Sequence, residues 1–339
     1  MNKQITTLLF LVFSFVLNAQ GNGKVSQLFQ DTTPLEIKLS YSNKELRKDT
    51  NDSTYIDTEL KYMHNGKWEQ LSVRLRARGN FRRAECYFPP VKMKIKKSVA
   101  KGSLFEGNKS LKLVLPCMLE PNKNDNILQE YLAYKLYEVI SPYHFKTRRV
   151  KINFEEKKGR KIKTHELEGF LIEDDKLVAK RFDGKVFERF IHPLAMDAQS
   201  SVENAFFQYL IGNTDFSVAY QHNGKLLYID KKIIPLPYDF DMAGLVDASY
   251  ATVNTTLGIE AVTDRVYRGF KRDEEVLQSV RAHFLNIKSD LKAIVSNTKA
   301  DFDNEKEYAS AASYIDSFYA ILEDDASFSK KILESVRTK

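Results

Sequence analysis

Two acidic motifs in this sequence could do chemistry. Asp239 and Asp241 lie in the segment Pro-Leu-Pro-Tyr-Asp-Phe-Asp at 235–241, which closes an apolar run. Upstream, Gly-Asn-Thr-Asp at 212–215 ends another apolar run with Asp215. Carboxylates at the ends of buried elements are costly unless a metal ion, a cation or a substrate compensates for their desolvation. One aspartate that orients a hydroxyl and one that binds a metal ion are the minimum for magnesium-dependent phosphoryl transfer.

Each of these carboxylates also has a purely structural interpretation. Asp215 could form a turn after the preceding helix, Asp239 could cap the segment that follows it, and Asp241 could be solvated. For an isolated Asp-x-Asp the structural interpretation is favoured. The upstream motif favours metal binding by Asp239 and a functional role for Asp215, and it leaves Asp241 open between the two interpretations.

Phosphoryl transfer also needs a cation for the phosphates, and one strand offers three lysines. Lys92, Lys94 and Lys96 alternate with apolar residues and therefore share one face of a strand. Periodicity does not choose among them, and at least some of them must belong to a solvated sheet face. Glu130, on the helix that follows, is a candidate ion-pair partner for the chosen lysine, or else an exposed helix charge.

The elements that must position these residues change in type along the chain. Residues 35–115 show strand periodicity, and the segment 126–140 has an apolar face at helical spacing. Beyond residue 176 the chain is mostly helical. The sequence predicts further strands at 149–154 and 166–172, a hairpin at 225–230 and 232–236, and helices at 202–211, 274–297, 305–323 and 327–336. We expect an α+β fold in two lobes, a sheet-rich lobe at 30–175 and a helical lobe at 176–339.

The first 19 residues read as a secretory signal peptide. Lys3 precedes the apolar segment 8–17, and Ala19 offers a small residue for cleavage. The apolar segment is short for a membrane span of about 20 residues, and no later segment is long and apolar enough for one. The sequence therefore predicts an exported protein of the periplasm, the cell surface or the extracellular space. In an oxidising compartment Cys86 and Cys117 could pair, or both could be free buried thiols.

Composition and charge exclude some classes of protein. The chain has 339 residues, 43% hydrophobic and 29% charged, which is ordinary for a globular protein. The formal net charge of +7 is diffuse, and its densest run, at 157–163, is typical of a hairpin tip. Basic residues are not interleaved with stacking aromatics, so a nucleic-acid partner is not expected.

The order of several motifs resembles the CotH (spore coat protein H) kinase-like family. Arg78-Gly79-Asn80 precedes the lysine-rich strand, and Gly169-Phe-Leu-Ile-Glu173 ends a later one. The two acidic motifs then follow in order, and the resemblance spans residues 70–270. It implies an atypical protein-kinase fold with ATP and a divalent metal ion between two lobes. Some members of this family phosphorylate proteins in secretory or extracellular settings, and others are known mainly as coat or surface proteins.

The resemblance also implies roles for the acidic residues. Asp215 matches the catalytic-loop aspartate, which orients the substrate hydroxyl or accepts its proton. Asp239 matches the aspartate that binds Mg²⁺ or Mn²⁺. Asp241 stands where ordinary kinases have glycine, and this second carboxylate could bind a second metal ion or orient the loop. Ordinary kinases carry a metal-binding asparagine five residues after the catalytic aspartate, where this chain has Tyr220. Asn223 is the nearest amide that could substitute.

The same resemblance implies the residues that hold the nucleotide. Lys94 is the first choice for the phosphates, because Lys92 aligns with a variably basic position of the family. Arg78, beside a glycine that permits close backbone approach, is a further phosphate ligand. Glu173 falls at the hinge, where it could contact the base or ribose or simply begin the linker.

The expected function is that of an exported atypical kinase that transfers the γ-phosphate of ATP to a protein hydroxyl with Mg²⁺. The alternative is a non-catalytic CotH-like protein that binds at the cell surface or envelope. The missing asparagine favours the alternative, and the retained Asp215 and Asp239 favour the kinase. A metal-dependent phosphohydrolase would need further His or Asp ligands, and the 6 histidines are scattered.

Overall fold

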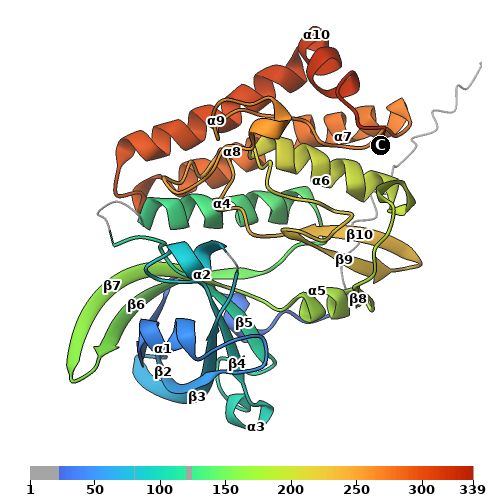
Figure 1. The fold of residues 1–339 in the computed structure, drawn as a ribbon. Helices are drawn as coiled ribbons and strands as arrows, with labels where there is room; N and C mark the ends of the chain where they lie inside the picture. The colour runs from blue at the N-terminus through green and yellow to red at the C-terminus, as the bar shows by residue number, and fades with distance from the viewer. Residues whose placement is uncertain (1–22, 80, 120–123, 339) are drawn as a thin grey trace, which may run out of the picture.

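The computed structural model describes residues 23–79, 81–119 and 124–338. The predicted signal peptide and Asn80 therefore lie outside the described residues. The chain is an α+β protein, as the sequence predicts, with a seven-stranded mixed barrel and a helical region (Figure 1).

The first part of the chain forms the closed barrel. Its strands are β1 (Leu35–Tyr41), β2 (Ile56–His64), β3 (Lys67–Ala77), β4 (Val91–Ile95), β5 (Ser110–Val114), β6 (Thr147–Lys158) and β7 (Lys161–Ile172). They follow the order β1-β2-β3-β4-β5-β7-β6. Parallel pairing of β1 with β6 closes the barrel, whereas all other neighbours in it are antiparallel.

Alternation of apolar and basic residues determines which face of each strand lies inside the barrel. Val91, Met93 and Ile95 of β4 are buried in the barrel core, so Lys92 and Lys94 lie on the outer face. Short helices α1 (Asn43–Lys48), α2 (Phe81–Glu85) and α3 (Lys97–Ala100) join the first strands. The sequence left open whether the two cysteines pair or remain free thiols. In the structure they form a disulfide, which joins Cys86 after α2 to Cys117 after β5.

The helical region has its own core and a small sheet. Its elements are α4 (Asn124–Ile140), α5 (Asp175–Arg181), α6 (Ala198–Leu210), α7 (Glu274–Asn286), α8 (Lys288–Asn297), α9 (Glu305–Glu323) and α10 (Asp325–Phe328), with strands β8 (Lys185–Phe187), β9 (Gly224–Ile229) and β10 (Lys232–Pro237). The strands pair in the order β10-β9-β8, and β9 and β10 form the predicted hairpin. Among the described residues, no helix is long and apolar enough to cross a membrane.

Three helical predictions differ in detail from the structure. The single helix predicted at 274–297 is two helices, because the chain turns at Ile287. The turn lets α7 contact α6 while α8 contacts α4. Helix α6 begins earlier than predicted, because Asp197 caps it by accepting a hydrogen bond from the Ser200 N–H at 3.0 Å. The segment predicted at 327–336 is the short α10 followed by one π-helical turn.

Helix α4 connects the two regions. It contacts β6 and β7 of the barrel and α6 and α8 of the helical region, and its buried side chains belong to the helical-region core. Figure 1 shows it lying between the barrel and the remaining long helices. After α4 the chain returns to the barrel for β6 and β7, and then enters the helical region again at Glu173.

Candidate active site

The backbone after β10 holds Asp239 in a fixed position. Asp239 has φ +68°, a left-handed conformation that aspartate tolerates better than most residues. Its N–H donates a hydrogen bond to the Tyr134 hydroxyl of α4 at 2.9 Å. The next residue, Phe240, is fully buried and packs against the rings of Tyr134 and Phe207. The Asp239 carboxylate is thereby directed away from the core, with 24% of its side chain exposed.

Arg78 brings a cation to Asp239 from the barrel. Arg78 follows β3, and its N–H donates to the Pro90 carbonyl at 2.9 Å, which fixes the start of the Arg-Gly-Asn motif. Its Nη2 lies 3.4 Å from Asp239 Oδ2. Gly79 has φ +74°, which a residue with a Cβ rarely adopts, so the glycine lets the chain turn at this point.

Asp241 belongs to a buried ionic cluster with Arg82 and Glu130. Arg82 of α2 lies 3.5 Å from Asp241 Oδ2 through Nε and 3.7 Å from Glu130 Oε2 through Nη1. Its Nη2 donates to the Leu115 carbonyl at 2.8 Å. Burial raises the pKa of both carboxyls, against the opposing effect of Arg82. Glu130 thus has an arginine from α2, and not a strand lysine, as its ion-pair partner.

Lys112 is a residue that sequence reasoning missed. It lies on β5 between two buried leucines, and its Nζ is buried without a hydrogen-bond partner among the described residues. The Nζ lies 4.0 Å from the Tyr238 ring centroid and 4.7 Å from that of Phe145. Burial, followed by the charge of Arg78, lowers the pKa of Lys112 to about 7, although Asp239 and another acid nearby oppose the shift.

The signal that could have found Lys112 is the strand register. A lone lysine in a short apolar strand resembles the solvated residues of any sheet, so its type alone does not distinguish it. Pairing of β4 with β5 sets Lys112 opposite Lys92. Lys94 pairs instead with Ser110, and its Nζ lies 4.5 Å from the Tyr55 ring centroid. Between Lys92 and Lys94, Lys92 is therefore the nearer to Lys112 along the sheet.

The loop that carries Asp215 is hydrogen-bonded to the chain that follows the Asp-Phe-Asp segment. Gly212 has φ +64° after α6, and its carbonyl accepts a hydrogen bond from the Gly244 N–H at 3.1 Å. Asn223 donates from Nδ2 to Asp215 Oδ2 at 2.9 Å, which leaves its carbonyl oxygen as the atom able to bind a cation. His222 Nε2 lies 3.0 Å from Asp215 Oδ1. The sequence thus named Asp215 and Asn223, which the structure brings into direct contact.

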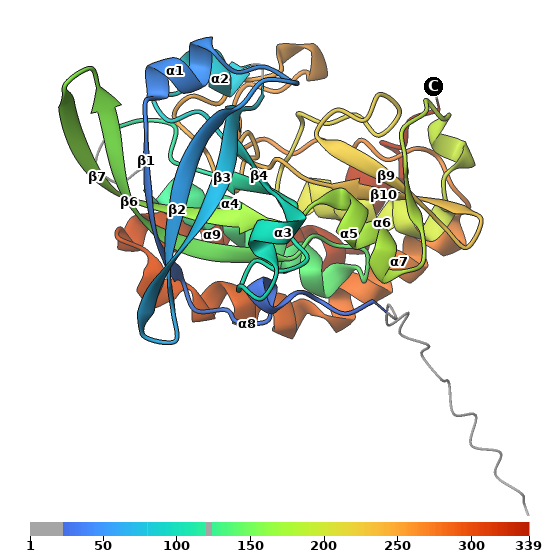
Figure 2. The same ribbon diagram turned by 90° about the horizontal axis from the view of Figure 1, so that it is seen from below.

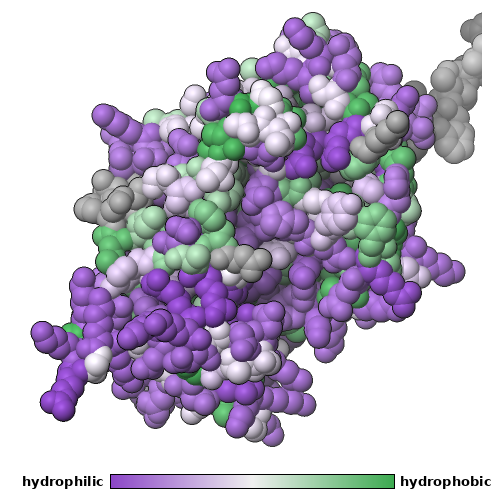
Figure 3. Space-filling model, viewed as in Figure 1, coloured by the Kyte–Doolittle hydropathy of each residue, from purple (hydrophilic) through white to green (hydrophobic). Residues whose placement is uncertain are grey.

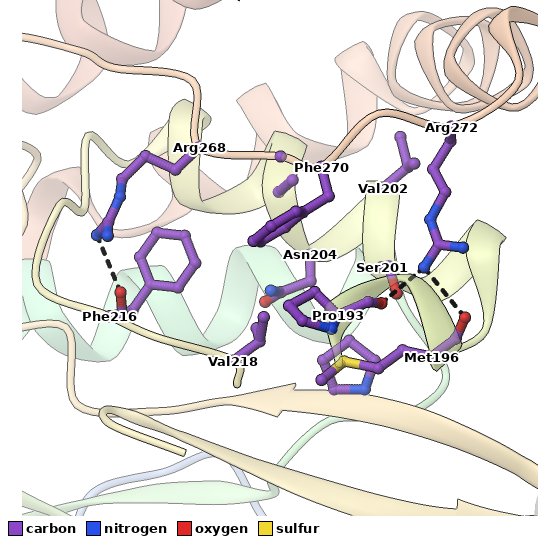
Figure 4. A pocket seen from close by; sticks show the side chains of 13 residues that line it. Pro193, Met196, Ser201, Val202, Asn204, Phe216, Val218, Arg268, Phe270 and Arg272 are labelled. Atoms are coloured by element: carbon purple, nitrogen blue, oxygen red, sulfur yellow. Dashed lines mark hydrogen bonds between the residues drawn. The ribbon is translucent and has the colours of Figure 1, made fainter. Parts of the chain in front are cut away.

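Arg268 holds the backbone on both sides of Asp215. Its Nη1 donates to the carbonyls of Thr214 at 2.5 Å and Phe216 at 2.9 Å. Figure 4 shows this arginine pointing at the Phe216 carbonyl from one end of a small pocket, while Arg272 lies at the other end. The pocket has a volume of about 30 Å³, which is room for little more than water. Arg268 is therefore a positioning residue for the Asp215 loop, and this pocket is not a substrate site.

Glu173 lies where the chain leaves β7 for the helical region, and its carboxylate has partners within the fold. It accepts a hydrogen bond from the Lys146 N–H at 2.6 Å and one from Arg181 of α5. The side chain is nearly fully buried, and burial raises its pKa. In this arrangement Glu173 ties the end of β7 to α5 and does not extend toward Asp239.

The residues of the site could bind a metal ion whose remaining ligands are phosphate oxygens of a bound molecule. Among the described residues, no three His, Cys, Asp or Glu side chains are arranged to hold a metal ion. Mg²⁺ commonly takes only one or two protein carboxylates, with phosphate oxygens and water completing its shell. Asp239 offers a carboxylate, while Arg78 and the unpartnered Lys112 offer cations for anionic oxygens beside it. In Figure 3, hydrophilic side chains line the hollow between the barrel and the helical region.

Comparison with known proteins adds nothing to this geometry. No family model, no curated protein and no solved structure matches the chain. The chemistry of the site is therefore argued from its own residues.

Proposed function

We propose that this protein is an exported, CotH-like atypical kinase with a two-lobed protein-kinase-like fold, which transfers the γ-phosphate of ATP to a protein hydroxyl. The observation that carries the proposal is the order of the elements with their charged residues. Strand β5 with Lys112 precedes helix α4 with Glu130, and Asp215 precedes the β9–β10 hairpin and Asp239. Protein kinases place a strand lysine, a helix glutamate, a catalytic aspartate and a metal-binding aspartate in that order.

The chain's own residues divide the work in this proposal. ATP, bound with Mg²⁺ or Mn²⁺, would supply the phosphoryl group and the neutralising metal charge. Asp239 would bind the metal, with Asn223 as the amide ligand and Asp241 fixing the loop from within the buried cluster. Lys112 and Arg78 would neutralise phosphate oxygens, a role that we assign to Lys112 in preference to Lys94 or Lys92. Asp215 would accept the proton of the acceptor hydroxyl at a carboxylate oxygen.

One observation favours the alternative, a non-catalytic CotH-like protein of the surface or envelope. Kinase activity requires a pair between the strand lysine and the helix glutamate. Here Glu130 pairs with Arg82, and Asp239 pairs with Arg78. In a protein that has lost catalysis, these two arginines would serve as permanent internal partners for the acids.

Phosphoryl transfer by the chain without residues 1–19 tests the proposal. The protein would be incubated with γ-labelled ATP, Mg²⁺ or Mn²⁺ and a peptide mixture presenting Ser, Thr and Tyr. Label transfer and a nucleotide-induced rise in the melting temperature are expected, and Asp215→Asn should abolish transfer while retaining the rise. Asp57→Asn, on β2 of the barrel, is the matched control for an Asp→Asn change. If the wild type shows no label transfer and no melting shift, the kinase is excluded and the non-catalytic binding protein remains.

A further inference from the structure

A cationic groove lies beside the candidate site on the outer face of the barrel. Its lining combines eight basic residues, one acidic residue and four uncharged ones: Arg74, Lys92, Lys94, Lys96, Lys97, Lys109, Lys176 and Lys180, then Asp174, and then Ile95, Gly107, Ser110 and Leu177. Figure 2 shows α3 and α5, which contribute to the lining, on the same face of the molecule, and Figure 1 shows α3 farther from the helical region than α5. The groove differs from the phosphate-binding residues proposed above, because neither Lys112 nor Arg78 lines it.

Two strands and one helix build the walls of this groove. On the barrel side, Arg74 of β3 pairs with Lys94 of β4, so their side chains stand together on the outer face. On the other side, Lys176 and Lys180 of α5 are four residues apart and lie on one face of the helix. The two walls come from separate elements, and both present ammonium or guanidinium groups to the space between them.

The positive charge of the groove has little compensation within the protein. Among the described residues, none of the eight basic side chains forms a salt bridge. The one acidic residue, Asp174, caps α5 by accepting a hydrogen bond from the Lys176 N–H at 3.1 Å. Like charges held together repel one another, and an anionic partner would relieve that repulsion.

The dimensions and chemistry of the groove narrow the class of anion. Its volume of about 910 Å³ is at the upper end of the range for small-molecule pockets, and it is open to solvent. The basic residues are spread over β3, β4, the α3 segment, the residue before β5 and α5, so their charges are distributed along the groove and do not converge on one point. No aromatic side chain is among the lining residues that the structure describes, whereas single-stranded nucleic acids bind largely by stacking.

We infer that this groove binds an acidic polypeptide segment, whose carboxylates pair with the two lysine walls. An extended peptide advances about 3.3 Å per residue, so alternate acidic side chains can reach successive lysines of a strand that rises at the same rate. The inference does not depend on phosphoryl transfer, because a binding protein would use the same surface.

Binding of a fluorescein-labelled Glu-rich peptide by the chain without residues 1–19 tests the inference, with the Gln counterpart as the neutral probe. The Glu-rich peptide should bind, and its affinity should fall as salt rises. Lys176→Glu/Lys180→Glu should weaken binding roughly tenfold or more. Lys92→Gln/Lys94→Gln on the opposite wall should also weaken it.

The matched control is Lys161→Glu/Lys163→Glu, which makes the same charge change on exposed residues of the β6–β7 hairpin tip. This control should retain binding within about twofold. If the control and the α5 variant lose peptide affinity equally, the groove is not the binding site. Unchanged binding in the Lys92→Gln/Lys94→Gln variant would lead to the same conclusion. If a sulfated oligosaccharide or oligo-dT binds more tightly than the Glu-rich peptide, and the same variants lose that binding, the partner is not an acidic polypeptide. Unfolding midpoints of all variants would verify that each is folded.

Discussion

Arg78 Nη2 lies 3.4 Å from Asp239 Oδ2, although the two residues are 161 positions apart in the chain. The pair crosses from the barrel to the helical region and keeps a partly exposed carboxylate neutralised. A metal ion that binds Asp239 would therefore compete with the Arg78 guanidinium, unless phosphate oxygens bind that guanidinium instead. In the proposed kinase, metal binding at Asp239 would therefore depend on the nucleotide.

Removing Arg78 should make metal binding less dependent on the nucleotide. In Arg78→Met, Asp239 loses its internal cation, so Mn²⁺ should bind more tightly in the absence of nucleotide, by roughly tenfold at most. In its presence the nucleotide-induced melting shift should shrink, because one phosphate ligand is missing. Mn²⁺ titration followed by electron paramagnetic resonance measures the first effect, and thermal unfolding measures the second. Unchanged Mn²⁺ affinity would contradict the competition.

Burial of Lys112 should reduce stability in a pH-dependent manner. The folded-state pKa of about 7 lies below the ordinary value of 10.5, so between these pH values the unfolded chain binds more protons. The free energy of unfolding of the wild type should therefore rise as pH rises from 7 toward 10.5. Lys112→Met removes this titration and should be more stable than the wild type at pH 7, by on the order of a few kcal/mol. Denaturant unfolding at several pH values measures the difference, and a constant advantage across this range would contradict the assignment.

Loss of Arg82 should be among the most destabilising single changes in the chain. Arg82→Met leaves Glu130 and Asp241 buried without their shared cation, which typically costs about 3–5 kcal/mol. Adding Glu130→Gln should recover part of that loss, because one of the two uncompensated carboxylates is then neutral. Chemical denaturation of the single and double variants measures both effects. A double variant less stable than Arg82→Met would contradict the shared role of the arginine.

The disulfide should stabilise the segment that carries this arginine. Cys86 directly follows α2, and its partner Cys117 is 31 residues away. Cys86→Ala/Cys117→Ala should lower the free energy of unfolding by about 2–4 kcal/mol. A reductant should destabilise the wild type by a similar amount and leave the double variant unaffected. Equal sensitivity of both proteins to the reductant would show that the loss does not come from this bond.

Arg268 should affect the transfer step more than nucleotide binding. Arg268→Ala frees the carbonyls on both sides of Asp215, so transfer should fall by roughly tenfold or more while the nucleotide-induced melting shift is retained. Arg272→Ala is the matched control, because Arg272 donates to the carbonyls of Pro193 and Met196 at the other end of the same pocket. Equal loss of transfer in both variants would point to general loosening of the pocket.

The sequence predicts the α+β class and most elements, because local periodicity determines them. Helix α9 has the predicted bounds, and the hairpin of β9 and β10 was recognised from its apolar runs. Closure of the barrel by β1 and β6 was not predicted, because pairing between distant strands leaves no local signal. The break between α7 and α8 depends on which partner each half contacts, which is a tertiary property.

The sequence was sufficient to name the acidic residues of the candidate site, but not all of its cationic residues. Asp215 and Asp239 could be named because they lie in acidic motifs at the ends of apolar runs, and Asn223 because it is the nearest amide to the position of the kinase asparagine. Lys112 required the register between β4 and β5, and the pairing of Glu130 with Arg82 required the position of α2 over the end of β5. Such cross-chain relationships depend on how the elements pack, which spacing along the chain does not determine.

Parallel pairing of β1 with β6 also affects the time course of folding. Leu35 pairs with Val150, so the first strand has no partner on this side until more than a hundred further residues are available. Loop-closure entropy opposes contacts of such separation, and they form slowly compared with helices or hairpins. The barrel of a growing chain therefore stays open while its first strands already exist. During that interval one edge of β1 is exposed, and a chaperone that covers strand edges would be of most use to this protein then.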